Sequence, residues 1–334
     1  MKKKTIAILL PVVVITAVMV FSIGKSNAAP YQKDSGLVFG TSYNITYESD
    51  TNYKDSIVAV MNRVDHSLSP FNKESIITAV NNNKDVTLDS FFTEVYTLAT
   101  EVSKSTNGAF DITVAPLVNA WGFGFKGGDF PTDKTIDSLK AFVGMEKVSL
   151  ANGKIEKTDP RVMLDCSAIA KGYAVDKVAD FLRSKGIKNF LVEIGGEIVA
   201  QGHNPKAKKW SIGITKPEDD SLAVNSELSD VITVTDIAMA TSGNYRNYYV
   251  YKGKKYAHTI DPHTGYPARQ DLLSATVMAP TCAMADAYAT AFMTMGYNKT
   301  MEFLKSSKGK KLSVYLIYTK DGKMCEYASQ NYKQ

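Results

Sequence analysis

Residues that could do chemistry gather in four short stretches, where small and polar side chains replace the apolar ones of an ordinary core. In the stretch 283–291, Asp286 and Thr290 are four residues apart, so a helix would place both on one face. Their neighbours are alanine and methionine, as on a buried helix, and a buried carboxylate needs a partner. Mg²⁺ would satisfy it, because this cation takes few protein oxygens and completes its shell with water and phosphate. The alternative is a surface helix on which Thr290 bonds back to a carbonyl.

The second stretch, 165–173, opens a helical pattern and carries Asp165, Ser167 and Lys171. Backbone N–H groups at a helix start attract anions, and Lys171 adds a positive charge one turn further in. These residues are equally consistent with an anion and metal site and with a simple helix cap by Asp165 or Ser167. The Gly-Gly pair at 195–196 follows an apolar strand pattern. It would let a ligand approach the backbone, although a turn explains it as well.

The third stretch holds two of the four histidines of the chain, His258 and His263, around ordinary turn chemistry at 261–265. A zinc site would need ligands beyond this pair. A neutral imidazole, with an unperturbed pKa of ~6.5, can instead accept a proton or contact a phosphate. Because the turns would hold His258 at the end of a strand, we predict it as the general base for a hydroxyl nucleophile. Contact with a nucleotide alone is the simpler alternative.

The fourth stretch combines glycine with aromatic residues between positions 108 and 124. It includes the segments Gly108-Ala109-Phe110-Asp111-Ile112-Thr113 and Trp121-Gly122-Phe123-Gly124. A helix stop followed by a packed aromatic loop is its simplest interpretation. A flat surface for a planar ligand is the functional alternative.

The elements that must position these stretches are helices and short strands in mixed order. Apolar residues recur at helical spacing in the segments 54–66, 91–102 and 170–185. Runs rich in aromatic and β-branched residues predict strands at 190–194, 210–214, 231–234, 248–251 and 313–319. Asp321-Gly322 predicts a hairpin turn after the last of them. We therefore predict an α+β fold with mixed or antiparallel sheets and packed helices, and not a doubly wound nucleotide-binding fold.

Composition limits the class of protein. The chain has 334 residues, of which 44% are hydrophobic and 22% charged, so it can bury a core and is not disordered as a whole. Three cysteines are too few and of the wrong parity for a disulfide scaffold. We predict Cys166, Cys282 and Cys325 to be small buried residues.

The N-terminal segment 1–28 predicts export. Its basic start, Lys2-Lys3-Lys4, precedes an uncharged, mostly apolar run at 6–23, and Ser26-Asn27-Ala28 fits cleavage before Ala29. A signal peptide and an uncleaved membrane anchor both fit, and either would place the body, 29–334, outside the cytoplasm. The segment carries four lysines and no acid, so removing these four charges from the total of +5 leaves +1. Such a body gives no argument for nucleic acid.

Taken in order, the polar stretches resemble the ApbE family, the FAD:protein FMN transferases, from about residue 36 to residue 296. The resemblance rests on Gly40-Thr41, Leu68-Ser69, Gly108-Ala109-Phe110-Asp111-Ile112-Thr113, Asp165-Cys166-Ser167-Ala168-Ile169-Ala170-Lys171-Gly172, Glu193-Ile194-Gly195-Gly196, Ser242-Gly243-Asn244-Tyr245, His258-Thr259-Ile260-Asp261-Pro262 with Thr264-Gly265 and Pro267, and Asp286-Ala287 with Thr290. Each motif alone is weak, but their joint order is highly specific.

The resemblance implies an exported bacterial enzyme with a T-fold-like catalytic body that would occupy residues 29–334. Such an enzyme binds FAD and Mg²⁺, cleaves the pyrophosphate, attaches FMN through a phosphoester to Ser or Thr of another protein, and releases AMP. Its acceptors are exported or membrane electron-transfer proteins that carry a short Ser/Thr-containing target motif.

Carried over by position, the resemblance assigns the metal to the side chains of Asp286 and Thr290 and the main-chain carbonyl of Ala168. It assigns the flavin nucleotide to Phe39, Phe71, Ala109, Phe110, Asp111, Asp165, Lys171 and His258. Many relatives have Met at position 39 and Tyr near position 71, so Phe71 lacks a hydroxyl. Cys166 replaces a usual apolar residue. Some relatives have a second Asp at position 289, where alanine here removes a potential metal ligand.

Two other functions remain open at this stage. Hydrolysis of FAD to FMN and AMP would use the same residues with water as the acceptor. A non-catalytic flavin-binding or electron-carrier protein at the cell surface would not need the pair Asp286 and Thr290.

Overall fold

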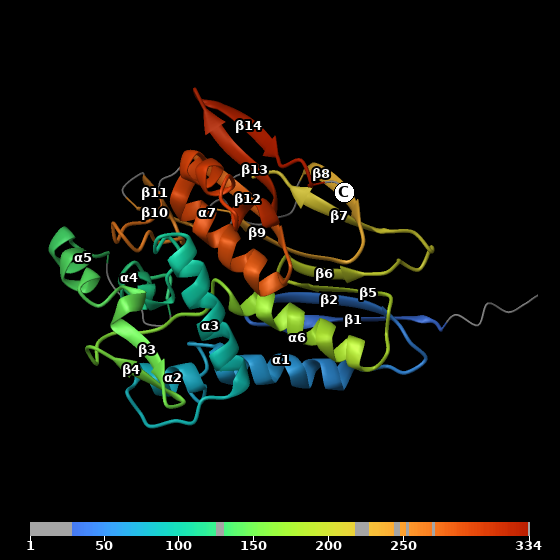
Figure 1. Ribbon diagram of the computed structural model, residues 1–334, viewed down its shortest axis with the longest axis horizontal. Helices are drawn as coiled ribbons and strands as arrows, with labels where there is room; N and C mark the ends of the chain where they lie inside the picture. Colours follow the sequence, from blue (N-terminus) through green and yellow to red (C-terminus); the bar gives the residue numbers. More distant parts are fainter. Residues whose placement is uncertain are drawn as a thin grey trace, which may run out of the picture.

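The computed structural model describes residues 29–124, 130–217, 227–243, 248–251, 254–268 and 271–332 (Figure 1). The predicted signal or anchor segment, 1–28, lies outside the described residues, and so do Asn244 and Tyr245 of the motif that begins at Ser242. Within the described ranges, no helix is both long enough and apolar enough to cross a membrane.

An antiparallel sheet of eight strands forms the centre of the molecule, in the order β1-β2-β5-β6-β9-β12-β13-β14. Its strands are β1 (Tyr31–Val38), β2 (Thr41–Glu48), β5 (Phe190–Ile194), β6 (Glu197–Gln201), β9 (Ile237–Gly243), β12 (Leu272–Ala279), β13 (Ser313–Lys320) and β14 (Lys323–Ala328). The antiparallel pairing of all neighbours confirms the predicted α+β architecture.

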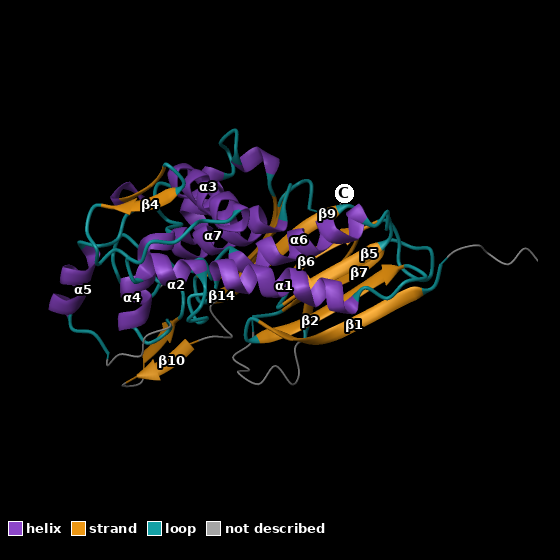
Figure 2. Ribbon diagram, turned by 90° about the horizontal axis from the view of Figure 1, so that it is seen from below, coloured by secondary structure: helices purple, strands orange, loops and turns teal. Residues whose placement is uncertain are grey.

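The long helices lie on one face of this sheet (Figures 1 and 2). They are α1 (Lys54–Leu68), α3 (Ser90–Ser105), α6 (Ala170–Ser184) and α7 (Cys282–Phe303). Helices α6 and α7 contact the sheet and each other, while α1 packs on α6 and α3 packs on α7. The predicted helices at 54–66, 91–102 and 170–185 therefore form, and the largest hydrophobic cluster joins them to the sheet.

A two-stranded sheet, β7 (Trp210–Thr215) with β8 (Leu228–Val234), packs on the opposite face. Its buried side chains, such as Trp210 and Ile232, form a second cluster with Ile198 of β6 and Ile317 of β13. This cluster covers the face of the central sheet that the helices leave bare.

Smaller elements complete the fold. They are α2 (Ile76–Asn81), α4 (Ala115–Ala120), α5 (Asp133–Lys140), β3 (Val148–Ala151), β4 (Lys154–Lys157), β10 (Tyr248–Tyr251), β11 (Lys254–Ala257) and short 3₁₀ turns at Ile112–Val114, Met145–Lys147 and Gly309–Lys311. A third, small cluster gathers around Trp121, with Ile136 of α5 and Ile260 among its buried members.

The prediction for the cysteines is wrong at one position. Cys166 and Cys282 are buried, but Cys325 is only partly covered. Cys325 lies on β14, which is the outermost strand of the central sheet and pairs with β13 alone among the described strands. The alternating exposure along this strand shows that nothing covers it as completely as the inner strands.

Candidate functional site

One cavity of about 1280 Å³ collects the predicted site residues. Its wall includes all eleven positions assigned above to nucleotide, metal or catalysis, namely Phe39, Phe71, Ala109, Phe110, Asp111, Asp165, Ala168, Lys171, His258, Asp286 and Thr290. The volume exceeds the ~300–1,000 Å³ typical of pockets for drug-sized ligands, so a dinucleotide has room. The individual roles of these residues remain predictions.

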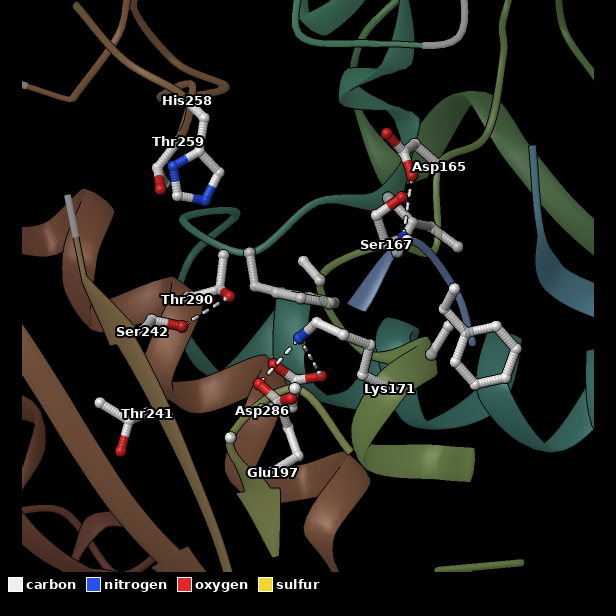
Figure 3. A pocket seen from close by; sticks show the side chains of 18 of the residues that line it. Asp165, Ser167, Lys171, Glu197, Thr241, Ser242, His258, Thr259, Asp286 and Thr290 are labelled. Carbon is white, nitrogen blue, oxygen red and sulfur yellow. Dashed lines mark hydrogen bonds and ion pairs between the residues drawn. The ribbon is translucent and has the colours of Figure 1, made fainter. Parts of the chain in front are cut away.

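The crossing of α6 and α7 brings the charged residues of the cavity together (Figure 3). A Cβ atom at Gly172 would come within 2.4 Å of the carbonyl oxygen of Cys282, so only glycine allows this close approach. The Gly172 backbone N–H donates to Oδ2 of Asp286 at 3.1 Å. Asp286 is buried, as its alanine-rich neighbourhood predicted, and it shares the cavity-facing side of α7 with Thr290.

Lys171 lies between two buried carboxylates. Its Nζ is 2.7 Å from Oε1 of Glu197 and 3.8 Å from Oδ2 of Asp286. Burial alone would lower the pKa of Lys171, but Asp286 and Glu197 together raise it above its usual value, so the ammonium stays charged. For Glu197, burial raises the pKa to about 7 and the Lys171 ammonium acts in the opposite direction.

Sequence reasoning missed Glu197. A signal was present, because an acidic residue stands directly between the Gly-Gly pair at 195–196 and the apolar run 198–200. Such a carboxylate starts a buried strand and must find a partner there. The Gly-Gly pair is indeed a turn, as one interpretation held: both residues have positive φ, 64° and 103°, and both also line the cavity.

The oxygen atoms near the crossing fit a hard cation. Oδ1 of Asp286 has no hydrogen-bond partner among the described residues, and neither does the buried Oε2 of Glu197. The Thr290 hydroxyl lies 3.2 Å from that of Ser242, a residue that the motifs included without assigning it a role. The described residues hold no group of three His, Cys, Asp or Glu that could bind a metal. A cation here would therefore depend on hydroxyl and carbonyl oxygens as well as carboxylates.

The start of α6 differs from the helix-cap interpretation. Ile169 occupies the N-cap position, and no side chain caps the helix. Asp165 is buried and accepts a hydrogen bond from the Ser167 backbone N–H at 2.8 Å, so it orders the turn before the helix. Burial raises the pKa of Asp165, and its hydrogen bonds to Ser167 lower it. One N–H group of the first helical turn, that of Gly172, is already bound to Asp286 and is not available to an anion.

Aromatic residues and a further buried carboxylate, Asp111, line another part of the wall. Phe71 is 63% exposed, whereas Phe110 is buried in the main core, so only Phe71 offers most of its side chain to a ligand. Asp111 accepts hydrogen bonds from the Thr113 backbone N–H at 2.7 Å and from the Thr113 hydroxyl at 2.6 Å. Burial raises the pKa of Asp111, and the Thr113 hydrogen bonds lower it. This carboxylate fixes the turn 108–113 in the wall.

His258 follows β11 and lies across the cavity from Lys171 and Asp286 (Figure 3). We call residues 258–267 the His258 loop. An isolated bridge between Ile260 and Pro267 closes it, and Trp121 Nε1 donates to the Gly265 carbonyl at 2.8 Å. Nε2 of His263 lies 2.8 Å from the carbonyl oxygen of Asn107. His263 therefore pins the loop, and it does not line the cavity beside His258.

Comparisons with known proteins identify relatives of the chain. The model of the ApbE family matches residues 39–316. The FAD:protein FMN transferase of Vibrio cholerae is 36% identical over 310 residues, which cover 90% of this chain and 91% of that protein. The enzyme of the same name from Haemophilus influenzae is 36% identical over 317 residues, which cover 90% of each chain.

Solved structures resemble the whole body. The flavin transferase ApbE from Vibrio cholerae superposes with a TM-score of 0.82 at 35% identity and covers 91% of this chain and 99% of its own. The ApbE protein from Thermotoga maritima superposes with a TM-score of 0.80 at 26% identity, covering 91% of this chain and 98% of its own. With a family model that spans most of its length and relatives this similar over nine-tenths of both sequences, the chain belongs to the ApbE family.

Proposed function

We propose that the chain is a magnesium-dependent FAD:protein FMN transferase that works outside the cytoplasm. The observation that carries this proposal is the single cavity in which polar stretches from distant parts of the sequence meet. The names of the relatives support flavin transfer, because they describe FAD as the donor and a protein as the acceptor of FMN.

The proposed reaction is a displacement at phosphorus. A Ser or Thr hydroxyl oxygen of the acceptor attacks the phosphorus of the FMN half of FAD, the pyrophosphate P–O bond breaks, and AMP leaves with the bonding electrons. Such transfers depend on positioning and charge neutralisation more than on a protein nucleophile. His258 accepts the hydroxyl proton from its side of the cavity. Lys171, whose raised pKa keeps it charged, lies on the opposite side of the cavity, where its positive charge would offset the negative charge of the phosphates.

Asp286, Thr290 and the Ala168 carbonyl would hold Mg²⁺, and the free Oδ1 atom of Asp286 fits that role. When bound, the cation neutralises pyrophosphate charge. Gly172 orients the Asp286 carboxylate through its backbone N–H, and Ser242 contacts the Thr290 hydroxyl. These two residues fix the donors before any cation arrives, which lowers the cost of assembling the site.

The test is mass spectrometry of a candidate acceptor after incubation with the protein, FAD and Mg²⁺. Covalent FMN on a Ser or Thr of the acceptor, with an equal amount of AMP released, is the expected result. Release of FMN and AMP without an adduct, at the same rate with and without acceptor, would replace the transferase by an FAD pyrophosphatase. Flavin binding that needs no metal and releases no AMP would indicate a carrier.

We further propose that residues 1–28 direct export and that the acceptor is an exported or membrane electron-transfer protein. The lysine triplet followed by an apolar run supports this. Removing residues 1–28 should leave a folded, active enzyme that stays in the cytoplasm of an expressing bacterium. Loss of folding on this deletion would show that the apolar run belongs to the core instead.

A further inference from the structure

We propose that Glu197 is a positioning residue that holds the Lys171 ammonium away from Asp286 and so keeps one Asp286 oxygen available for a divalent cation. This inference rests on the proposed function, because it assumes that Asp286 is a metal ligand. It adds a residue that neither the sequence motifs nor the comparisons assign, and it gives Lys171 and Glu197 a shared role.

The distances show that the Lys171 ammonium pairs more closely with Glu197 than with Asp286. Nζ of Lys171 makes a hydrogen-bonded ion pair with Oε1 of Glu197 at 2.7 Å, whereas its distance to Oδ2 of Asp286 is 3.8 Å. The second distance is beyond hydrogen-bond range, so Lys171 attracts Asp286 without binding it directly. Figure 3 draws dashed lines from the Lys171 ammonium to both carboxylates, with Glu197 coming from β6 and Asp286 from α7.

The contacts of Asp286 are confined to one of its oxygens. The Gly172 backbone N–H and the Lys171 ammonium both approach Oδ2. Oδ1 has no partner among the described residues and is left as a ligand atom. If Glu197 lost its charge, Asp286 would be the only carboxylate among the described residues within ion-pair distance of the ammonium. The flexible lysine side chain would then pair with Asp286 and compete with a cation for it, because interactions between charges are strong in a buried site.

A purely structural ion pair explains Glu197 less well. Glu197 is 2% exposed, and its Oε2 has no hydrogen-bond partner among the described residues. An unsatisfied buried acceptor is costly, and a buried ion pair is weak evidence for stability even when fully bonded. Stability alone would disfavour a buried glutamate at position 197. A requirement to restrain Lys171 explains why the carboxylate is there.

The experiment measures cation binding directly, with Mn²⁺ as the probe in the absence of FAD, by electron paramagnetic resonance or calorimetry. The key variant is Glu197→Gln, which keeps the shape and one acceptor oxygen but removes the charge. Lys171→Met and the double variant Lys171→Met/Glu197→Gln complete a double-mutant cycle. Asp286→Ala is the control for the metal site itself, and thermal melts establish that each variant is folded.

We expect Glu197→Gln to weaken Mn²⁺ binding by about tenfold or more, which corresponds to about 1.4 kcal/mol. The double variant should recover most of this affinity, because no ammonium remains to occupy Asp286. Removing both partners of a buried ion pair can also restore stability, so the melts must show that Glu197→Gln is fully folded at the temperature of the binding measurement. In a folded variant, weak Mn²⁺ binding that the double variant recovers reports competition by Lys171 and not loss of the fold.

Each remaining outcome has a separate meaning. If Asp286→Ala abolishes Mn²⁺ binding but Glu197→Gln leaves it unchanged, the inference is wrong and the proposed metal site stands. If Glu197→Gln weakens binding and the double variant is equally weak, Glu197 does not act through Lys171, and the inference is again wrong. If Asp286→Ala binds Mn²⁺ like the wild type, the metal site itself is misplaced and the magnesium dependence in the proposed function fails.

Discussion

The two sides of the cavity are built in different ways. At the crossing of α6 and α7, Lys171, Asp286 and Glu197 stand on two long helices and an inner strand of the central sheet, and their backbones belong to the main core. On the other side, His258 belongs to a loop. This loop is held in place by turns, by one bridge between Ile260 and Pro267, and by the small cluster around Trp121.

This difference separates two requirements of the proposed chemistry. Charges that must stay buried and close together need a rigid frame, because a small displacement would leave one of them unpaired. A proton acceptor must meet an incoming protein hydroxyl, and a loop can adjust to that partner. Substitutions at the crossing should therefore affect cation binding and, through it, the displacement that releases AMP. Substitutions around the His258 loop should affect transfer with little change in binding.

The largest effect is expected at Asp286. Asp286→Ala should abolish AMP release, because the pyrophosphate charge would no longer be neutralised by a held cation. The measurement is AMP formation by chromatography at limiting Mg²⁺, with circular dichroism to establish the fold. Glu302→Ala, which removes an exposed carboxylate from the same helix, is the matched control and should retain activity. Wild-type turnover in Asp286→Ala would place the cation elsewhere.

The second prediction concerns His258. His258→Ala should lower the transfer rate by ~10²–10⁴-fold with little change in FAD affinity, because a general base acts in the transition state and not in binding. Transfer rate and FAD binding are measured side by side. His203, which contacts Tyr31 and does not line the cavity, provides the control variant His203→Ala. A parallel loss of affinity and rate would make His258 a nucleotide contact, and an unchanged rate would remove it from the mechanism.

The third prediction concerns the α6–α7 crossing and the pH dependence of the free energy of unfolding. Asp176 of α6 accepts hydrogen bonds from the backbone N–H groups of Cys282 and Ala283, both at 2.8 Å, and so anchors the start of α7. Burial raises the pKa of Asp176 to about 6, against those hydrogen bonds, which lower it. A raised carboxyl pKa means that the folded state holds the proton more tightly. The stabilisation is complete below the unfolded value of ~3.9 and is lost as pH rises through about 6.

Between pH 4 and pH 7, the wild type should therefore lose about 2–3 kcal/mol of unfolding free energy relative to Asp176→Asn. Urea denaturation of both proteins across this range measures the difference, which cancels the titration of the other carboxyl groups. A difference that does not vary with pH would show that Asp176 titrates at an ordinary pKa. The start of α7 would then not depend on its protonation.

The smallest effect is expected at the hydrogen bond that joins the small cluster around Trp121 to the His258 loop. Trp121→Phe keeps an aromatic ring but removes the indole N–H that donates to the Gly265 carbonyl. Losing one such bond costs about 1 kcal/mol, so transfer should slow by roughly fivefold while global stability changes little. Hydrogen exchange of the amides in the loop should rise in the same variant. Cooperative destabilisation of the whole chain would contradict a separate, locally held loop.

The sequence predicted helices and strands more completely than it predicted tertiary contacts between side chains. The strands at 190–194 and 248–251 and the helix at 170–185 follow from periodicity, because burial on one face repeats along the chain. Asp286 and Thr290 could be paired for the same reason, since helical spacing alone puts them on one face. Glu197 was missed, and Ser242 was named in a motif without a role. The contacts of both depend on residues that are distant in sequence, Lys171 and Thr290.

The sequence by itself determined the α+β class, the placement of Asp286 and Thr290 on one helix, and the family to which the chain belongs. It left open whether the sheet is mixed or antiparallel, which the structure decided. These properties depend on local spacing and on motif order, which a linear chain carries. The tertiary structure alone decided that Asp165 orders a turn and does not cap α6, and that the Lys171 ammonium pairs with Glu197. Burial and hydrogen bonding between distant segments select one partner for each charged side chain among several of similar charge. For Lys171, this selection requires the packed crossing of α6 and α7, where Gly172 allows the two backbones to come into contact.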